Sequence, residues 1–183
     1  MADSNITKRA LANALKTLMN EKHFEKISVS DICEKCSMNR KSFYYHFKDK
    51  YDLVNWIFDT EFVDYLKVHR EEEGFNKISS LCYYFYENRV FYYRALSVEG
   101  QNSFSEYFHD LSFSAIAMRL SELFPSEELS DFQINFYADA IVSAIKRWIL
   151  ARNCMPPEEF ISQIKECLCF LAERYSELGS PEE

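Results

Sequence analysis

The chain has 183 residues, of which 48% are hydrophobic, and its formal net charge is −8. Three glycines and four prolines are too few for the frequent turns of an all-β architecture, so we expect an all-α protein. No apolar run approaches the roughly 18 residues of a membrane span, and residues 1–5 lack the features of a signal peptide. We therefore expect a cytoplasmic protein with no membrane contact.

The charge is unevenly distributed along the chain. Residues 1–50 carry ten Lys and Arg against six Asp and Glu, whereas residues 51–183 carry eleven against twenty-three. Such asymmetry predicts one segment that approaches phosphate and another that does not. We expect a small head, residues 1–50, and a larger helical body, residues 51–183.

Three helices are predicted in the head. The first runs from about Asn5 to Glu21, where apolar residues form a single stripe. Ser28 has the side chain of an N-cap and precedes a short second helix that ends near Cys36. A three-residue turn then leads to a third short helix over residues 40–47. Two short helices joined by a tight turn, behind a longer helix, are typical of a helix-turn-helix.

The surface of the third helix carries the functional prediction. Phe43 and Phe47 are four residues apart and can both face the core, which presents the polar side chains elsewhere. The N-terminal end of a recognition helix enters the major groove, where Arg40 and Lys41 can donate to guanine O6 and N7. The side chains expected to bond phosphate are Ser42, Tyr44, His46 and Lys50. Residue chemistry alone leaves open that these are ordinary solvated side chains.

The body is predicted to be helical throughout. A long helix should follow Asp49, and further helices should cover about residues 76–88 and 103–124. Ser130 and Gln133 have the spacing of a capping box at the start of another long helix. The last helix should open at Pro156, since proline is tolerated in a first turn.

The segment from Ile27 to Leu53, with its core Phe-Tyr-Tyr-His-Phe-x-x-Lys-x-x-Leu, closely resembles the N-terminal domain of TetR-family regulators. The resemblance implies base contacts for Arg40 and Lys41. It implies phosphate contacts for Ser42, Tyr44, His46 and Lys50, and places Ser28, at the cap of the second helix, in the same DNA-binding set.

Two features qualify or extend this resemblance. The family usually has Ala-Gly where this chain has Cys36-Ser37, and a serine there is strained if its φ is positive. The run from Phe91 to Phe104 looks like the C-terminal region of the DhaS-like branch of the family, named for activators of dihydroxyacetone-kinase operons.

The resemblance implies a body that senses a signal and dimerises. The signal is either a small-molecule effector or a protein partner; for an effector, several aromatic residues can line a pocket, namely Tyr86, Tyr93, Phe104, Tyr107 and Phe108. The last two long helices are expected to pair with their copies in a homodimer through Phe132, Phe136, Ile145, Trp148, Ile164 and Leu168. The expected protein is thus a dimeric, sequence-specific regulator that binds a double-stranded DNA operator.

Two other classes of site receive less support. The spacing Cys33-x-x-Cys36 is compatible with a metal or redox site. A structural zinc site requires four ligands, however, and no second cysteine pair follows at suitable spacing. We expect both cysteines to pack in the core, with no metal and no cofactor. No glycine-rich phosphate loop or nucleophile motif indicates an enzyme.

Overall fold

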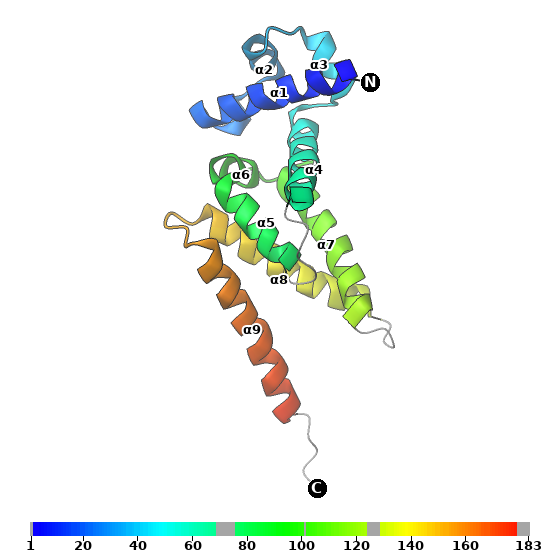
Figure 1. Cartoon of the computed structure of the whole chain (residues 1–183), viewed down its shortest axis with the longest axis vertical. Coiled ribbons are helices and arrows are strands. Elements are labelled where there is room, and N and C mark those ends of the chain that lie inside the picture. Colours follow the sequence, from blue (N-terminus) through cyan, green and yellow to red (C-terminus); the bar gives the residue numbers. More distant parts are fainter. Residues whose placement is uncertain (1, 69–75, 101, 124–128, 179–183) are drawn as a thin grey trace.

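The computed structural model describes residues 2–68, 76–100, 102–123 and 129–178 (Figure 1). Over these ranges the secondary structure is helical and contains no strand, which confirms the all-α prediction. The elements in chain order are α1 (Ala2–Glu21), η1 (Phe24–Lys26), α2 (Val29–Lys35), α3 (Arg40–His46), α4 (Lys50–Val68), α5 (Asn76–Glu87), α6 (Arg89–Leu96), α7 (Phe104–Leu123), α8 (Asp131–Leu150) and α9 (Pro157–Leu178).

Helices α1 to α3 form the head at one end of the molecule, and α4 leads from it into the body (Figure 1). Leu11 and Leu15 of α1 are fully buried, as are Ile32 of α2 and Phe43 of α3. Their shared core fixes the three helices together, because burying each such side chain contributes about 1.5–3 kcal/mol. The helix-turn-helix is therefore a rigid unit.

The centre of the body is filled by aromatic rings. Phe58 of α4 lies 5.5 Å from Phe104 and 6.0 Å from Phe108, measured between ring centroids. Phe85 and Tyr92 pack on the same cluster at 5.8 Å and 6.1 Å from Phe58. All five rings are at most 2% exposed, so α4, α5, α6 and α7 are held around one apolar centre.

Helices α8 and α9 complete the body. Ser130 and Gln133 form the capping box expected at the start of α8, which confirms that prediction. The chain reverses after α8, and α9 then runs away from the other helices toward the C-terminus (Figure 1). Among the described helices, none is both long enough and apolar enough to cross a lipid bilayer.

Candidate nucleic-acid interface

Helix α3 is fixed at both ends by its own sequence. Asn39 is its N-cap, and the Asn39 side-chain oxygen accepts a hydrogen bond of 2.8 Å from the Ser42 backbone N–H. The helix ends at Phe47, whose backbone is extended. Phe43 and Phe47 are 0% and 4% exposed, so the apolar side of α3 is anchored in the head, as predicted.

The opposite side of α3 is open to solvent. Arg40 and Lys41 are exposed, Ser42 and His46 are half-buried, and Tyr44 is 51% exposed. The Arg40 guanidinium lies 5.9 Å from the centroid of the Tyr44 ring. A hydrogen bond with Tyr44 raises the pKa of Arg40. The five predicted contact residues of α3 therefore lie on the part of the helix that is not buried in the head.

Sequence reasoning missed one residue of this surface. Tyr45 is 82% exposed and packs edge-on against the His46 ring at 4.8 Å. A signal for it was present: with about 100° between successive helical residues, position 45 lies opposite the buried position 43. Tyr45 thus belongs with the candidate interface.

Ser28 caps α2, as predicted. Its hydroxyl accepts from the Asp31 N–H at 3.1 Å, while the Ser28 N–H donates to the Asp31 carboxylate at 2.7 Å. These bonds from the Ser28 backbone and hydroxyl, together with Lys22, lower the pKa of Asp31 to about 2. The capping box therefore sets the direction in which α2 enters the motif, whereas a DNA contact by Ser28 stays a prediction.

Lys50 has a role that differs from the predicted phosphate contact. Its Nζ donates to the carbonyl oxygens of Phe24, Glu25 and Ile27 at 2.8, 3.1 and 2.8 Å. The ammonium also lies 4.6 Å from the Phe24 ring centroid, and burial lowers the pKa of Lys50. Because a lysine has three N–H donors, all are used within the protein. Lys50 fixes the segment before α2 onto α4, and its predicted phosphate contact stays a prediction.

The turn between α2 and α3 shows the strain expected of its serine. Ser37 has φ of 55°, in the left-handed region where side chains are disfavoured. Cys33 is buried, and Cys36 is half-buried and donates from Sγ to the Ile32 carbonyl oxygen at 3.2 Å. Burial raises the pKa of both thiols. This geometry supports the core-packing interpretation.

The five residues predicted to line an effector pocket lie partly in the core and partly on the surface. Phe104 and Phe108 lie in the packed aromatic centre, and Tyr107 donates to the Asp59 carboxylate of α4. Tyr86 and Tyr93 are exposed. Aromatic residues close together in sequence thus divide between the core and the surface, and an effector pocket stays a prediction.

The predicted dimer face is likewise divided. Phe132 and Phe136 of α8 are 78% and 57% exposed, in keeping with an uncovered apolar face. Ile145 and Trp148, by contrast, are 1% and 4% exposed within the single chain. Trp148 stacks on Phe160 of α9 with centroids 4.3 Å apart. Ile145 and Trp148 are therefore core residues and are removed from the interface. Ile164 is half-buried, and the Leu168 side chain lies outside the described residues.

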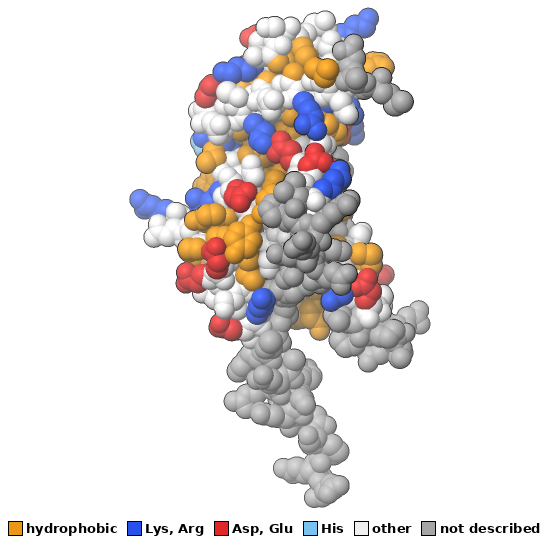
Figure 2. Space-filling view, viewed as in Figure 1, with side chains coloured by type: hydrophobic (Ala, Val, Ile, Leu, Met, Phe, Trp, Pro, Cys, Tyr) orange, Lys and Arg blue, Asp and Glu red, His pale blue; other side chains and the backbone are white. Residues whose placement is uncertain are grey.

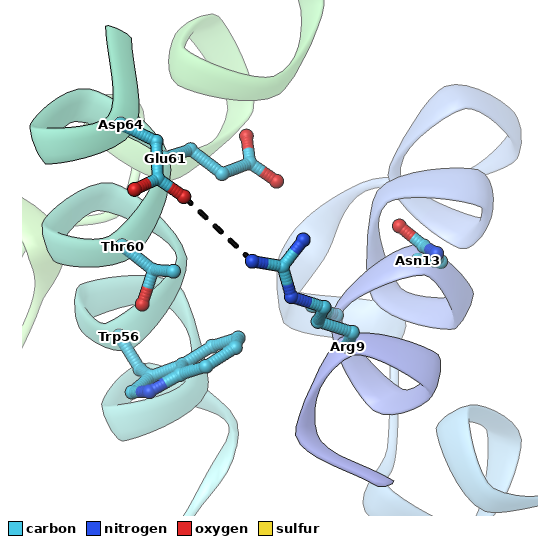
Figure 3. Close-up of a pocket in the computed structure, with 7 residues that line it drawn as sticks. Arg9, Asn13, Trp56, Thr60, Glu61 and Asp64 are labelled. Atoms are coloured by element: carbon cyan, nitrogen blue, oxygen red, sulfur yellow. Dashed lines mark ion pairs between the residues drawn. The ribbon is translucent and has the colours of Figure 1, made fainter. Parts of the chain in front are cut away.

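A shallow pocket of about 100 Å³ lies between α1 and α4, where the head meets the body (Figure 3). Arg9 reaches from α1 toward Asp64 on α4, with 3.7 Å between guanidinium nitrogen and carboxylate oxygen. Lys16 pairs with Glu61 at 2.6 Å nearby. Basic and acidic side chains alternate on this face of the molecule (Figure 2). These ion pairs connect α1 to α4 at the edge of the pocket.

Family models of transcriptional regulators match both the head and the body of the chain. A family model described as "Bacterial regulatory proteins, tetR family" matches residues 8–57. A second, described as "Transcriptional regulator C-terminal region", matches residues 72–168.

Among characterised proteins, the chain is similar to the HTH-type dhaKLM operon transcriptional activator DhaS of Lactococcus lactis. The two are 29% identical over 162 residues, which is 88% of this chain and 82% of that protein.

Two solved structures share the fold. The first is a dihydroxyacetone kinase operon activator DhaS, with a TM-score of 0.64 and 24% identity over 91% of this chain and 96% of that chain. The second is a TetR transcriptional regulator from Streptococcus agalactiae, with a TM-score of 0.68 and 22% identity over 88% and 93% of the two chains.

Proposed function

We propose that this chain, which belongs to the TetR family of bacterial regulatory proteins and is a transcriptional regulator, binds a two-fold symmetric operator as a homodimer. The observation that carries the proposal is the surface of α3, which exposes Arg40, Lys41, Tyr44 and Tyr45 while Phe43 and Phe47 hold the helix in the core. We place the protein in the cytoplasm, with head and body divided near residue 50. Its family consists of regulators and not of enzymes.

The contacts divide by chemistry. Arg40 and Lys41 stand at the N-terminal end of α3, where cationic donors can reach guanine O6 and N7 and so discriminate sequence. Ser42, Tyr44 and His46 bond phosphate and set the register of the head on the duplex. Tyr45, the most exposed aromatic residue of α3, contributes a further contact through its hydroxyl or ring edge. Lys50 acts from inside the head by holding the segment before α2.

The dimer is proposed to form along the uncovered face of α8. Phe132 and Phe136 stand four residues apart on that face, and Ala140 and Ser143 continue it as exposed small residues. Small side chains let helices approach closely, and two exposed Phe side chains are costly to leave in water. An isologous two-fold contact would set two heads about 34 Å apart, one turn of B-DNA.

The packed centre of the body favours control by a protein partner over control by a small molecule. The residues predicted to line a pocket are either in contact with the other core rings or on the surface. Binding of a partner that prefers one body conformation would shift operator affinity by its differential affinity for the two states. A thermal-shift screen tests the distinction: a metabolite that raises the Tm in a saturable way would refute protein control.

Selection of bound fragments from a random duplex pool tests the proposed function. We expect enrichment of a near-palindrome with half-sites about 10 base pairs apart, and loss of that enrichment for the Arg40→Ala, Lys41→Ala double variant. Arg119→Ala is the matched control, since Arg119 lies on α7 and pairs with Glu122 of its own helix at 2.8 Å. A wild-type pool with no enriched motif would overturn the proposal.

A further inference from the structure

Helix α6 is a short helix set firmly in the body. It spans Arg89–Leu96, and its buried residues are Phe91, Tyr92, Ala95 and Leu96. The Tyr92 hydroxyl lies 2.8 Å from that of Tyr84 on α5, in the buried interior. In Figure 1, α6 lies between α1 and the C-terminal end of α8. Because one side of α6 is fully buried, it cannot slide without opening the core.

Arg94, near the end of α6, holds the C-terminus of α1. Its Nη1 donates to the Lys22 carbonyl oxygen, and its Nη2 donates to the Asn20 carbonyl oxygen at 3.4 Å. The last carbonyl groups of a helix have no partners within it and carry partial negative charge. A guanidinium that bridges two of them both satisfies these groups and fixes the direction of the helix end.

Arg89, at the start of α6, makes the same type of contact with α8. Its Nε donates to the Ile149 carbonyl oxygen at 3.1 Å, and its Nη2 donates to that of Ala151 at 2.5 Å. Ala151 is the C-cap of α8. The two arginines, five positions apart on one rigid helix, therefore connect the C-terminal ends of α1 and α8.

A second chain of polar contacts holds α1 at another point. Lys16 of α1 lies 2.6 Å from Glu61 of α4, and the Tyr84 hydroxyl donates to the same carboxylate at 3.4 Å. Tyr84 in turn contacts Tyr92 of α6. A helix held at one point can pivot about it, whereas a helix held near its middle and at its end has a defined direction.

We propose that Arg89 and Arg94 are positioning residues that make α6 a strut between α8 and α1, fixing the orientation of the DNA-reading head relative to the dimer helix. The inference rests on the proposed function, because it assigns the strut the task of setting the distance between two heads. Both hydrogen bonds of Arg89 described above go to the C-terminal end of α8, outside the head. If replacing Arg89 changes the orientation of the head, α6 acts as a strut. If it does not, Arg89 and Arg94 act only as two independent helix caps.

The test compares operator binding at two half-site spacings. Wild type, Arg89→Gln, Arg94→Gln and the control Arg119→Gln are each titrated with the selected operator and with the same operator lengthened by one base pair between half-sites. A strut predicts that both α6 variants lose about twofold to thirtyfold of the discrimination between spacings, while Arg119→Gln keeps the wild-type ratio. Light scattering checks that every variant is still a dimer.

Hydrogen exchange without DNA gives an answer that is independent of the proposed function. If α6 is a strut, Arg89→Gln speeds exchange in the last turn of α1 as well as around residues 149–151. If Arg89→Gln affects only residues 149–151 and leaves the spacing ratio at the wild-type value, the proposal is overturned.

Conservative variants protect the test against simple misfolding. Arg89→Lys and Arg94→Lys keep the charge but lack the planar fork that reaches two carbonyl groups at once. They should fold and show a smaller loss of spacing discrimination in the same direction. Lysine variants with full wild-type discrimination would contradict the role of the bridging geometry.

Discussion

Replacing Lys50 with methionine separates the structural role of this residue from a phosphate contact. Methionine keeps the length and apolar stem but removes three bonds, of 2.8, 3.1 and 2.8 Å, to the carbonyl oxygens of Phe24, Glu25 and Ile27. Each hydrogen bond to a charged group is worth about 1.5–3 kcal/mol. Because the three share one half-buried side chain and solvent can replace part of them, we expect a total loss of about 2–4 kcal/mol. For a chain of this size, the Tm should fall by roughly 5–15 °C.

The salt dependence of operator affinity provides the decisive assay. Each neutralised phosphate contributes about 0.9 to the slope of log affinity against log salt, so losing one contact per subunit lowers the slope of a dimer by about 1.8. Lys50→Met should leave that slope unchanged at temperatures well below its Tm. Lys41→Met, on the exposed side of α3, is the matched control that tests whether Lys41 neutralises phosphate. A Lys50→Met protein with wild-type Tm and a reduced slope would refute the structural assignment.

Four further predictions concern the head and the dimer face. Arg40→Ala should weaken operator binding by roughly 1–3 kcal/mol and relax preference at one base pair per half-site. Competition with operator variants measures this, and an equal loss of affinity for every sequence would show that Arg40 contacts phosphate instead. Ser37→Gly should stabilise the head by about 1 kcal/mol, because it relieves a φ of 55° at some cost in chain entropy; a lower Tm would contradict this. Phe136→Glu should shift light scattering toward monomer, since burying an unpaired charge is costly, and an unchanged dimer would exclude this face. Alanine at both Cys33 and Cys36 should preserve operator binding, with a cavity cost on the order of 1 kcal/mol per sulfur; peroxide or chelator sensitivity confined to wild type would reveal a sensor instead.

The head could be predicted from sequence because its signals are local. The N-cap of α2 follows from Ser28 and Asp31, three positions apart, and the burial of Phe43 and Phe47 follows from their helical spacing. Lys50 shows where local reasoning stops. Its three partners lie 23 to 26 positions earlier, and nothing in the residues around Lys50 indicates that the segment before α2 passes beside it.

The body shows the same limit more strongly, because helical spacing tells which residues share a face but not what covers that face. Trp148 follows Phe136 by twelve positions, which places it about 120° further round the axis of α8, yet the sequence prediction assigns both residues to a partner subunit. In the folded chain, the Trp148 ring stacks with that of Phe160 at 4.3 Å and with that of Tyr86 at 6.1 Å, so α9 and α5 cover the face of α8 that carries Trp148. Phe132 and Phe136 at the other end meet no such cover and are 78% and 57% exposed. The two faces of α8 therefore have different functions: the face with Ile145 and Trp148 packs within the protomer, and the face with Phe132 and Phe136 is the surface that a second subunit can bury. This division explains why a charge at Trp148 would damage the fold of the protomer, whereas a charge at Phe136 tests the dimer alone.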